Sequence, residues 1–85
     1  MGTKNDPGNF DCYEAALPDE PMFVLLARDP MFAELVRLWA DRRERDVACG
    51  ERPESDVHMV MEATRCATVG ENWRRSNMGM WRRKP

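Results

Sequence analysis

The chain has 85 residues, a net charge of −2 at pH 7 and no apolar run long enough to span a membrane. These properties predict one small, soluble, cytoplasmic domain without a membrane anchor. Its three cysteines contain no Cys-x-x-Cys pair, which argues against a disulfide framework and a zinc site, so we expect free thiols, no metal and no cofactor.

Residues 1–21 are predicted to form a flexible N-terminal arm. The segment is polar, is interrupted by prolines and has too few apolar residues to fold alone. Phe10, Tyr13 and Leu17 could dock onto the rest of the protein. Residues 11–17 could form one or two helical turns before Pro18.

Residues 22–27 are a short apolar run whose length suits a buried strand or a first helical turn equally well. A lone strand would leave its backbone groups without partners, so we favour an extended or partly helical segment packed on the helices that follow. If the run is a strand, its partner would be the same segment of a second copy.

Residues 30–49 are predicted to form an amphipathic helix. Asp29 is suited to cap its first turn, and Pro30 fits the first helical position. One face carries apolar residues at helical spacing, and we expect Trp39 to lie in the core. The residues of this face are Phe32, Leu35, Val36, Trp39, Ala40 and Val47.

A second helix is predicted over residues 53–76. Gly50 supplies a left-handed stop for the first helix. The second helix can begin at Pro53 or be capped by Ser55, and Asn77 and Gly79 end it. The short connector makes the two helices antiparallel neighbours. We therefore predict an all-α fold, an antiparallel helical hairpin, with an arm (residues 1–21), a hairpin domain (22–76) and a basic tail (77–85).

Apolar residues cover most of the circumference of the second predicted helix, which is more than one partner helix can bury. The rest of this apolar surface must meet the arm, residues 22–27 or another subunit, and small residues at positions 63, 67 and 70 would allow a close approach. The wide apolar arc predicts a homo-oligomer.

No strong catalytic or metal-binding pattern is present. His58 and Glu62 are four residues apart on a helix, but two ligands do not make a metal site and the chain has no second histidine. No serine or cysteine has a histidine at the spacing of a nucleophile motif. We therefore expect a protein that is not an enzyme.

The candidate binding residues are basic and aromatic. Residues 1–71 carry 15 acidic and 8 basic side chains, whereas residues 72–85 carry 5 basic and no acidic ones, so attraction of anions is local and generic nucleic acid should bind weakly. Indoles can stack on planar groups, and guanidiniums bind phosphate or carboxylate. The candidates for a ligand site are Arg28, Arg37, Trp73, Arg74 and Arg75, and those for tail contacts are Trp81, Arg82 and Arg83.

Each basic candidate also has a structural explanation. Arg28 lies beside the predicted helix start, where amides favour an anion, but it could instead pair with Asp29 or another acid. Trp73 could be a core residue, and Trp81 could fold back on the hairpin. The basic tail would then only complement the negative end of a helix.

The sequence resembles a group of small phage and prophage proteins over residues 19–75. That group has a Glu-Pro-x-Phe-x-Leu-x-Ala-x-Asp segment, then a helix with Val-x-x-Trp-Ala, then an Ala-Arg-x-Cys-Ala-like stretch before a terminal Trp-Arg. This likeness is carried here by residues 19–30, 35–40 and 62–67 and by Trp73-Arg74. Thr64 and Thr68 stand where such proteins often have alanine.

The resemblance implies a cytoplasmic location in a host cell and, by analogy, a role in antagonising host defence. We expect a non-enzymatic counter-defence protein that sequesters an anionic, nucleotide-like signalling ligand. The alternative is an inhibitor of a host defence effector, similar in action to an anti-CRISPR protein, that works by protein–protein contact. A closed pocket of arginines and aromatics would favour the first, and an exposed contact patch the second.

Overall fold

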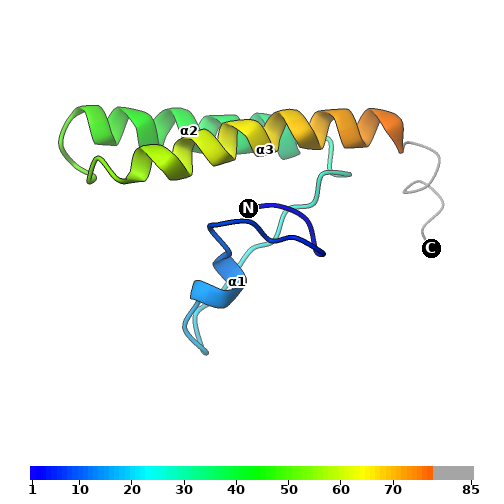
Figure 1. The fold of residues 1–85 in the computed structure, drawn as a ribbon, viewed down its shortest axis with the longest axis horizontal. Helices are drawn as coiled ribbons and strands as arrows, with labels where there is room; N and C mark the ends of the chain where they lie inside the picture. The colour runs from blue at the N-terminus through cyan, green and yellow to red at the C-terminus, as the bar shows by residue number, and fades with distance from the viewer. Residues whose placement is uncertain (78–85) are drawn as a thin grey trace.

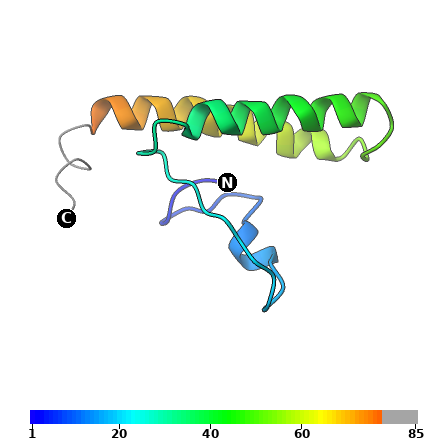
Figure 2. The ribbon, with the colours of Figure 1, turned by 180° about the vertical axis from the view of Figure 1, so that it is seen from behind.

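The computed structural model of the protein describes residues 1–77. Within this range it contains the helices α1 (Cys12–Ala15), α2 (Phe32–Ala48) and α3 (Asp56–Ser76) and no strand. The helices α2 and α3 pack against each other and run in opposite directions, whereas α1 lies apart from them on the arm (Figures 1 and 2). The all-α class predicted from the sequence is confirmed for the described residues.

Asp29 holds the turn that precedes α2. Its Oδ1 accepts from the backbone N of Met31 at 2.8 Å, and its carbonyl accepts from the backbone N of Phe32 at 3.0 Å. The predicted cap is therefore wrong in its position, because Met31 is the N-cap residue of α2 and no side chain caps the helix. These bonds hold residues 29–32 in a turn tighter than an α-helix, so α2 begins at Phe32 and not at Pro30.

Gly50 ends α2 with a positive φ of 81°. The backbone N of Gly50 donates to the carbonyl of Val47 at 3.1 Å, and that of Glu51 donates to the carbonyl of Asp46 at 2.8 Å. Together these bonds form a Schellman motif, which satisfies carbonyls that the helix leaves free. The predicted left-handed stop at Gly50 is confirmed.

Of the two predicted starts of α3, the one at Pro53 is wrong and the one that has Ser55 as the N-cap residue agrees with the structure. Pro53 and Ser55 belong to a preceding turn, in which the backbone N of Asp56 donates to the carbonyl of Pro53 at 3.0 Å, and the Ser55 side chain caps nothing. The helix therefore begins at Asp56. It ends at Ser76 as predicted, and the backbone N and Nδ2 of Asn77 both donate to the carbonyl of Trp73.

The contact between α2 and α3 is built from small side chains. Its buried residues are Ala40, Val60, Ala63 and Ala67, and Gly70 is buried at one end. A Cβ atom on Gly70 would collide with the ring of Phe32, so glycine is what lets this ring approach α3. The small residues at positions 63, 67 and 70 therefore lie in the contact with α2 and not on a separate surface for another partner, and no large side chain in residues 1–77 is fully buried.

The prediction that Trp39 lies in the core is wrong. Its side chain is 37% exposed, because the neighbouring Ala40 occupies the position that faces α3 and turns Trp39 to the flank of the helix. The guanidinium of Arg43 lies over the indole, 4.9 Å from the ring centroid.

Trp39→Ala should consequently lower the free energy of unfolding by about 1 kcal/mol, mostly through the lost cation–π contact and partial burial. A core tryptophan would cost about 3–5 kcal/mol. Urea unfolding followed by circular dichroism distinguishes the two values. A loss of free energy of unfolding in the larger range would show that Trp39 is a core residue after all.

Arg43 also joins α2 to the start of α3 through Asp56. The Asp56 carboxylate is buried and its Oδ2 accepts from Arg52 Nε at 2.9 Å and from Arg43 Nη1 at 3.1 Å. The hydrogen bond from Arg52, followed by that from Arg43, lowers the pKa of Asp56 below its ordinary value of 3.8, although burial opposes this shift.

This lowered pKa predicts acid sensitivity. Asp56 stabilises the fold fully at pH values above its unfolded pKa, and the stabilisation decreases as the pH falls through the lower folded pKa. In urea titrations, we expect the free energy of unfolding to decrease as the pH is lowered below about 4. The Asp56→Asn protein should be less stable than the wild type at neutral pH, and its free energy of unfolding should decrease less on acidification. If the wild type and Asp56→Asn had the same pH dependence of stability, Asp56 would not be the source of the acid sensitivity.

The arm touches the helix pair near its beginning and then extends away from it (Figure 1). The amino group of Met1 lies 3.3 Å from the buried Oε2 of Glu62, an ion pair without hydrogen-bond geometry. Asp11 caps the single turn of α1 by accepting from the backbone N of Tyr13 at 3.1 Å. Residues 22–26 form neither strand nor helix, and the packing expected for them is wrong at Phe23, which is 87% exposed.

Candidate functional site

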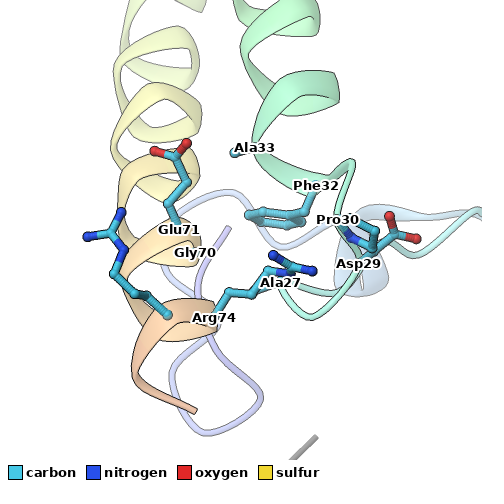
Figure 3. A pocket seen from close by; sticks show the side chains of 9 residues that line it. Ala27, Asp29, Pro30, Phe32, Ala33, Gly70, Glu71 and Arg74 are labelled. Atoms are coloured by element: carbon cyan, nitrogen blue, oxygen red, sulfur yellow. The ribbon is translucent and has the colours of Figure 1, made fainter. Parts of the chain in front are cut away.

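A pocket of about 270 Å³ lies where the last turns of α3 meet the loop before α2. Residues from the loop before α2, from the first turn of α2 and from the last turns of α3 line it (Figure 3): Ala27, Asp29, Pro30, Phe32, Ala33, Gly70, Glu71, Arg74 and Arg75.

Gly70 and Arg74 position the walls of this pocket. Because Gly70 has no side chain, the Phe32 ring lies directly against α3 and forms the apolar wall. Arg74 is half-buried, and its Nε donates to the carbonyl of Arg28 at 3.3 Å, which ties the loop to α3. Figure 3 shows the Arg74 side chain extending toward that loop.

The charges around the pocket are balanced. Arg74 and Arg75 contribute two guanidiniums, and Asp29 and Glu71 contribute two carboxylates. The Asp29 carboxylate already binds the amide of Met31 and turns away from α3 in Figure 3. The pocket can therefore present arginine to a small anion, but its carboxylates weaken the attraction.

Glu71 is engaged by an arginine of α2. Arg37 Nη2 donates to Glu71 Oε1 at 2.8 Å and to Thr68 Oγ1 at 3.1 Å. This hydrogen bond lowers the pKa of Glu71, with a smaller contribution from the charge of Arg75, and it raises the pKa of Arg37. Arg37 thus links α2 to α3 outside the pocket.

The structure brings together two of the five residues predicted for a ligand site. Arg74 and Arg75 line the pocket, Arg28 contributes its carbonyl to Arg74, and Arg37 pairs with Glu71. Trp73 does not line the pocket and is 42% exposed, so it is not a core residue. The predicted tail contacts Trp81, Arg82 and Arg83 lie outside the described residues.

Sequence reasoning missed Phe32 and Glu71 as pocket residues. Phe32 was assigned to the core because it follows the apolar period of its helix. The available signal was Gly70, since a glycine inside a helix often marks a close approach.

The cysteines and the metal-ligating side chains are the other candidate chemical groups in residues 1–77. Burial, with a smaller effect from the charge of Glu62, raises the pKa of the Cys66 thiol, which disfavours the thiolate that a nucleophile requires. Cys12 and Cys49 are exposed and, like Cys66, unpaired. Within this range no three side chains of the metal-ligating types converge on one point.

Large apolar side chains are exposed on residues 13–26, which run from the arm into the apolar segment after it, and on the outer face of α2. The most exposed are Phe23 at 87% and Tyr13 at 80%. Others on the same two regions are Leu17, Met22, Val24, Leu26, Met31 and Leu38. Exposed apolar surface of this extent is typical of a surface that contacts another macromolecule.

No family model, curated protein or solved structure matches this chain. The likeness to small phage proteins therefore stays a prediction from the residues. No helix within residues 1–77 combines the length and the apolar content that crossing a membrane requires.

Proposed function

We propose that the protein is a non-enzymatic, phage-type counter-defence protein that acts by contact with a host protein. The observation that supports this most is the exposure of residues 13–26, where the apolar side chains of Tyr13, Leu17 and Phe23 are at least 70% exposed. Aromatic side chains on accessible segments are common anchors in protein interfaces, because they supply a large contact area with few rotatable bonds.

The charge of the arm adds specificity to this contact. Asp11, Glu14, Asp19 and Glu20 lie among its apolar residues, and residues 9–24 contain no basic side chain. An acidic, apolar segment favours a partner with a basic rim around apolar pockets. Nucleic-acid-binding defence effectors have such basic surfaces, which is why this class of target suits the arm.

A second candidate function is sequestration of an anionic, nucleotide-like ligand in the pocket beside Phe32. Arg74 and Arg75 can bind phosphate, and the Phe32 ring offers an apolar wall. The pocket is smaller than the roughly 300–1,000 Å³ of ordinary ligand sites, and two carboxylates border it. These features favour protein contact as the main function.

Native mass spectrometry of the full chain after incubation with host lysate, and separately with host small-molecule extract, tests both candidates. We expect a bound polypeptide that is lost in Phe23→Ser and retained in the control Val69→Ser, whose valine is also exposed but lies on α3. A bound small molecule that is lost in Arg75→Ala would support the pocket instead. If Phe23→Ser and the wild type captured equal amounts of the polypeptide, the proposed contact through residues 13–26 would be contradicted.

Homo-oligomerisation is part of the proposal. Only four hydrophobic residues among residues 1–77 are buried, and all four are alanine or valine. A chain of this size gains little stability from such a core, and a second copy would cover further apolar surface.

A further inference from the structure

Residues 22–26 are an extended stretch of chain between the arm and α2. Residues 20–26 contain no helix, turn or bend, and Figure 2 shows the chain running from the far end of the arm to the beginning of α2. Pro21 favours this conformation, because a proline disfavours helical backbone in the residue before it.

The backbone of this stretch has no hydrogen-bond partner within residues 1–77. In that range no other group bonds to the N–H groups from Met22 to Leu26 or to the carbonyls from Met22 to Leu25. The next bond along the chain closes the following turn, from the backbone N of Asp29 to the carbonyl of Leu26 at 2.9 Å. A row of unpaired donors and acceptors is the feature by which an edge strand pairs with another chain.

The side chains of the stretch are accessible on both sides. Neighbouring residues of an extended chain point to opposite sides, and both Phe23 and Val24 are more than two-thirds exposed. Neither side of the stretch is therefore covered by the helices at these positions. Phenylalanine and valine are also residues that strands favour.

We propose that residues 22–26 bind as an added strand to the open edge of a β-sheet in a host protein. The inference rests on the proposed function, contact with a host protein, and specifies the kind of partner. Backbone hydrogen bonds to the sheet edge supply affinity, and alternate side chains enter pockets beside it. A helix is the less favourable bound form, because five residues between Pro21 and the turn at residues 27–30 give little more than one helical turn.

The acids before the stretch specify the kind of sheet edge. Asp19 and Glu20 directly precede Pro21. Folded proteins commonly protect an open sheet edge against aggregation with charged side chains, lysine above all. An apolar strand preceded by two acids is complementary to an edge protected in this way.

A second copy of this stretch is a poorer partner than such an edge. In a parallel pair of copies, Asp19 and Glu20 would face the same acids, which repels. In an antiparallel pair centred on Val24, Glu20 would face Arg28 and Asp19 would face Asp29, so one attraction is offset by one repulsion. The charges therefore favour another protein as the occupant.

Full-length chains with a single N-methylated amide test the proposal. They are made by chemical synthesis with ligation at Cys49, and the methyl group is placed on Phe23, Val24, Leu25 or Leu26. Each methyl group removes one N–H and leaves the side chains and the charge unchanged. Because none of these amides has a partner within residues 1–77, circular dichroism should show wild-type helix content in all four chains.

Host lysate is the probe, and native mass spectrometry measures the captured polypeptide. Successive N–H groups of a strand point in opposite directions, so one sheet edge bonds to alternate residues only. Capture should fall more than about tenfold for one alternate pair, either 23 and 25 or 24 and 26. Capture by the other pair, which is the matched control, should stay within about twofold of the wild type.

The charge of the edge is tested by Asp19→Asn. It should capture less polypeptide than the control Glu54→Gln, which removes an acid from the connector between α2 and α3. Equal capture by these two variants would overturn the basic character of the edge.

Strand addition and the proposed function fail in different ways. If all four methylated chains captured as much polypeptide as the wild type, or all four lost it equally, strand addition would be overturned. Loss of capture in Phe23→Ser would still support protein contact in that case. A wild type that captures only a second copy of itself would overturn the host sheet edge as the occupant, and one that captures no polypeptide at all would contradict the proposed function and strand addition together.

Discussion

Ala67→Leu should destabilise the protein by about 1–3 kcal/mol. Ala67 is 0% exposed and lies in the middle of the contact with α2. A leucine there must push the helices apart or adopt a strained rotamer, which typically costs about 1–3 kcal/mol. The core of this protein is small, so that loss is a large share of its total stability.

Urea unfolding measures the loss of stability in Ala67→Leu, and Val69→Leu is its control. Val69 is 53% exposed on the same helix, so a leucine at position 69 should change the free energy of unfolding by less than about 0.5 kcal/mol. If both variants had the same unfolding midpoint as the wild type, α2 and α3 would not be packed at Ala67.

The helices were predictable from the sequence because local signals determine their ends. Gly50 adopts the left-handed conformation that few other residues tolerate, and Asn77 ends α3 by bonding back to the carbonyl of Trp73. The range 30–49 begins two residues before α2, and the range 53–76 begins three residues before α3, whereas the alternative start after Ser55 agrees with the structure. Asp29 and Ser55 are both residues that favour helix caps, and the sequence does not show whether such a residue begins an α-helix or a preceding tight turn.

The orientation of individual side chains was less predictable. Trp39 and Ala40 are adjacent on one apolar face, and the apolar period alone does not decide which of them faces α3. The structure places the smaller residue in the contact, since alanines at positions 63 and 67 bring the helices close together. Periodicity identifies a face of a helix, but the sizes of the residues on both helices decide which part of that face is buried.

The pocket could not be predicted because it depends on contacts between distant residues. Arg37 was a candidate ligand residue, but its partner Glu71 lies 34 positions away on α3. Arg74 reaches the carbonyl of Arg28 across 46 positions. Composition indicated that basic residues collect near the end of α3, but only the packed helices show that Arg74 and Arg75 share a pocket with Phe32.

Gly70→Ala tests the most specific of these contacts. In an isolated helix this change stabilises by about 1 kcal/mol, because alanine loses less backbone entropy than glycine. Here the new Cβ would lie 2.8 Å from Cδ2 of Phe32 and would contact Cε2 more closely still, so the ring must move. Displacing a packed ring costs about 1–3 kcal/mol, and we expect a net loss of up to about 2 kcal/mol.

A double-mutant cycle with Phe32→Ala separates the two effects of Gly70→Ala. In the Phe32→Ala protein no ring collides with the new Cβ atom, so the higher helix propensity of alanine should dominate. Gly70→Ala should then stabilise that protein by about 1 kcal/mol. The sign of the effect therefore reverses between the two backgrounds, and the coupling between positions 32 and 70 should be about 1–3 kcal/mol in urea unfolding. If Gly70→Ala stabilised both proteins equally, the Phe32 ring would not lie against α3, and the apolar wall of the candidate ligand pocket would be lost with it.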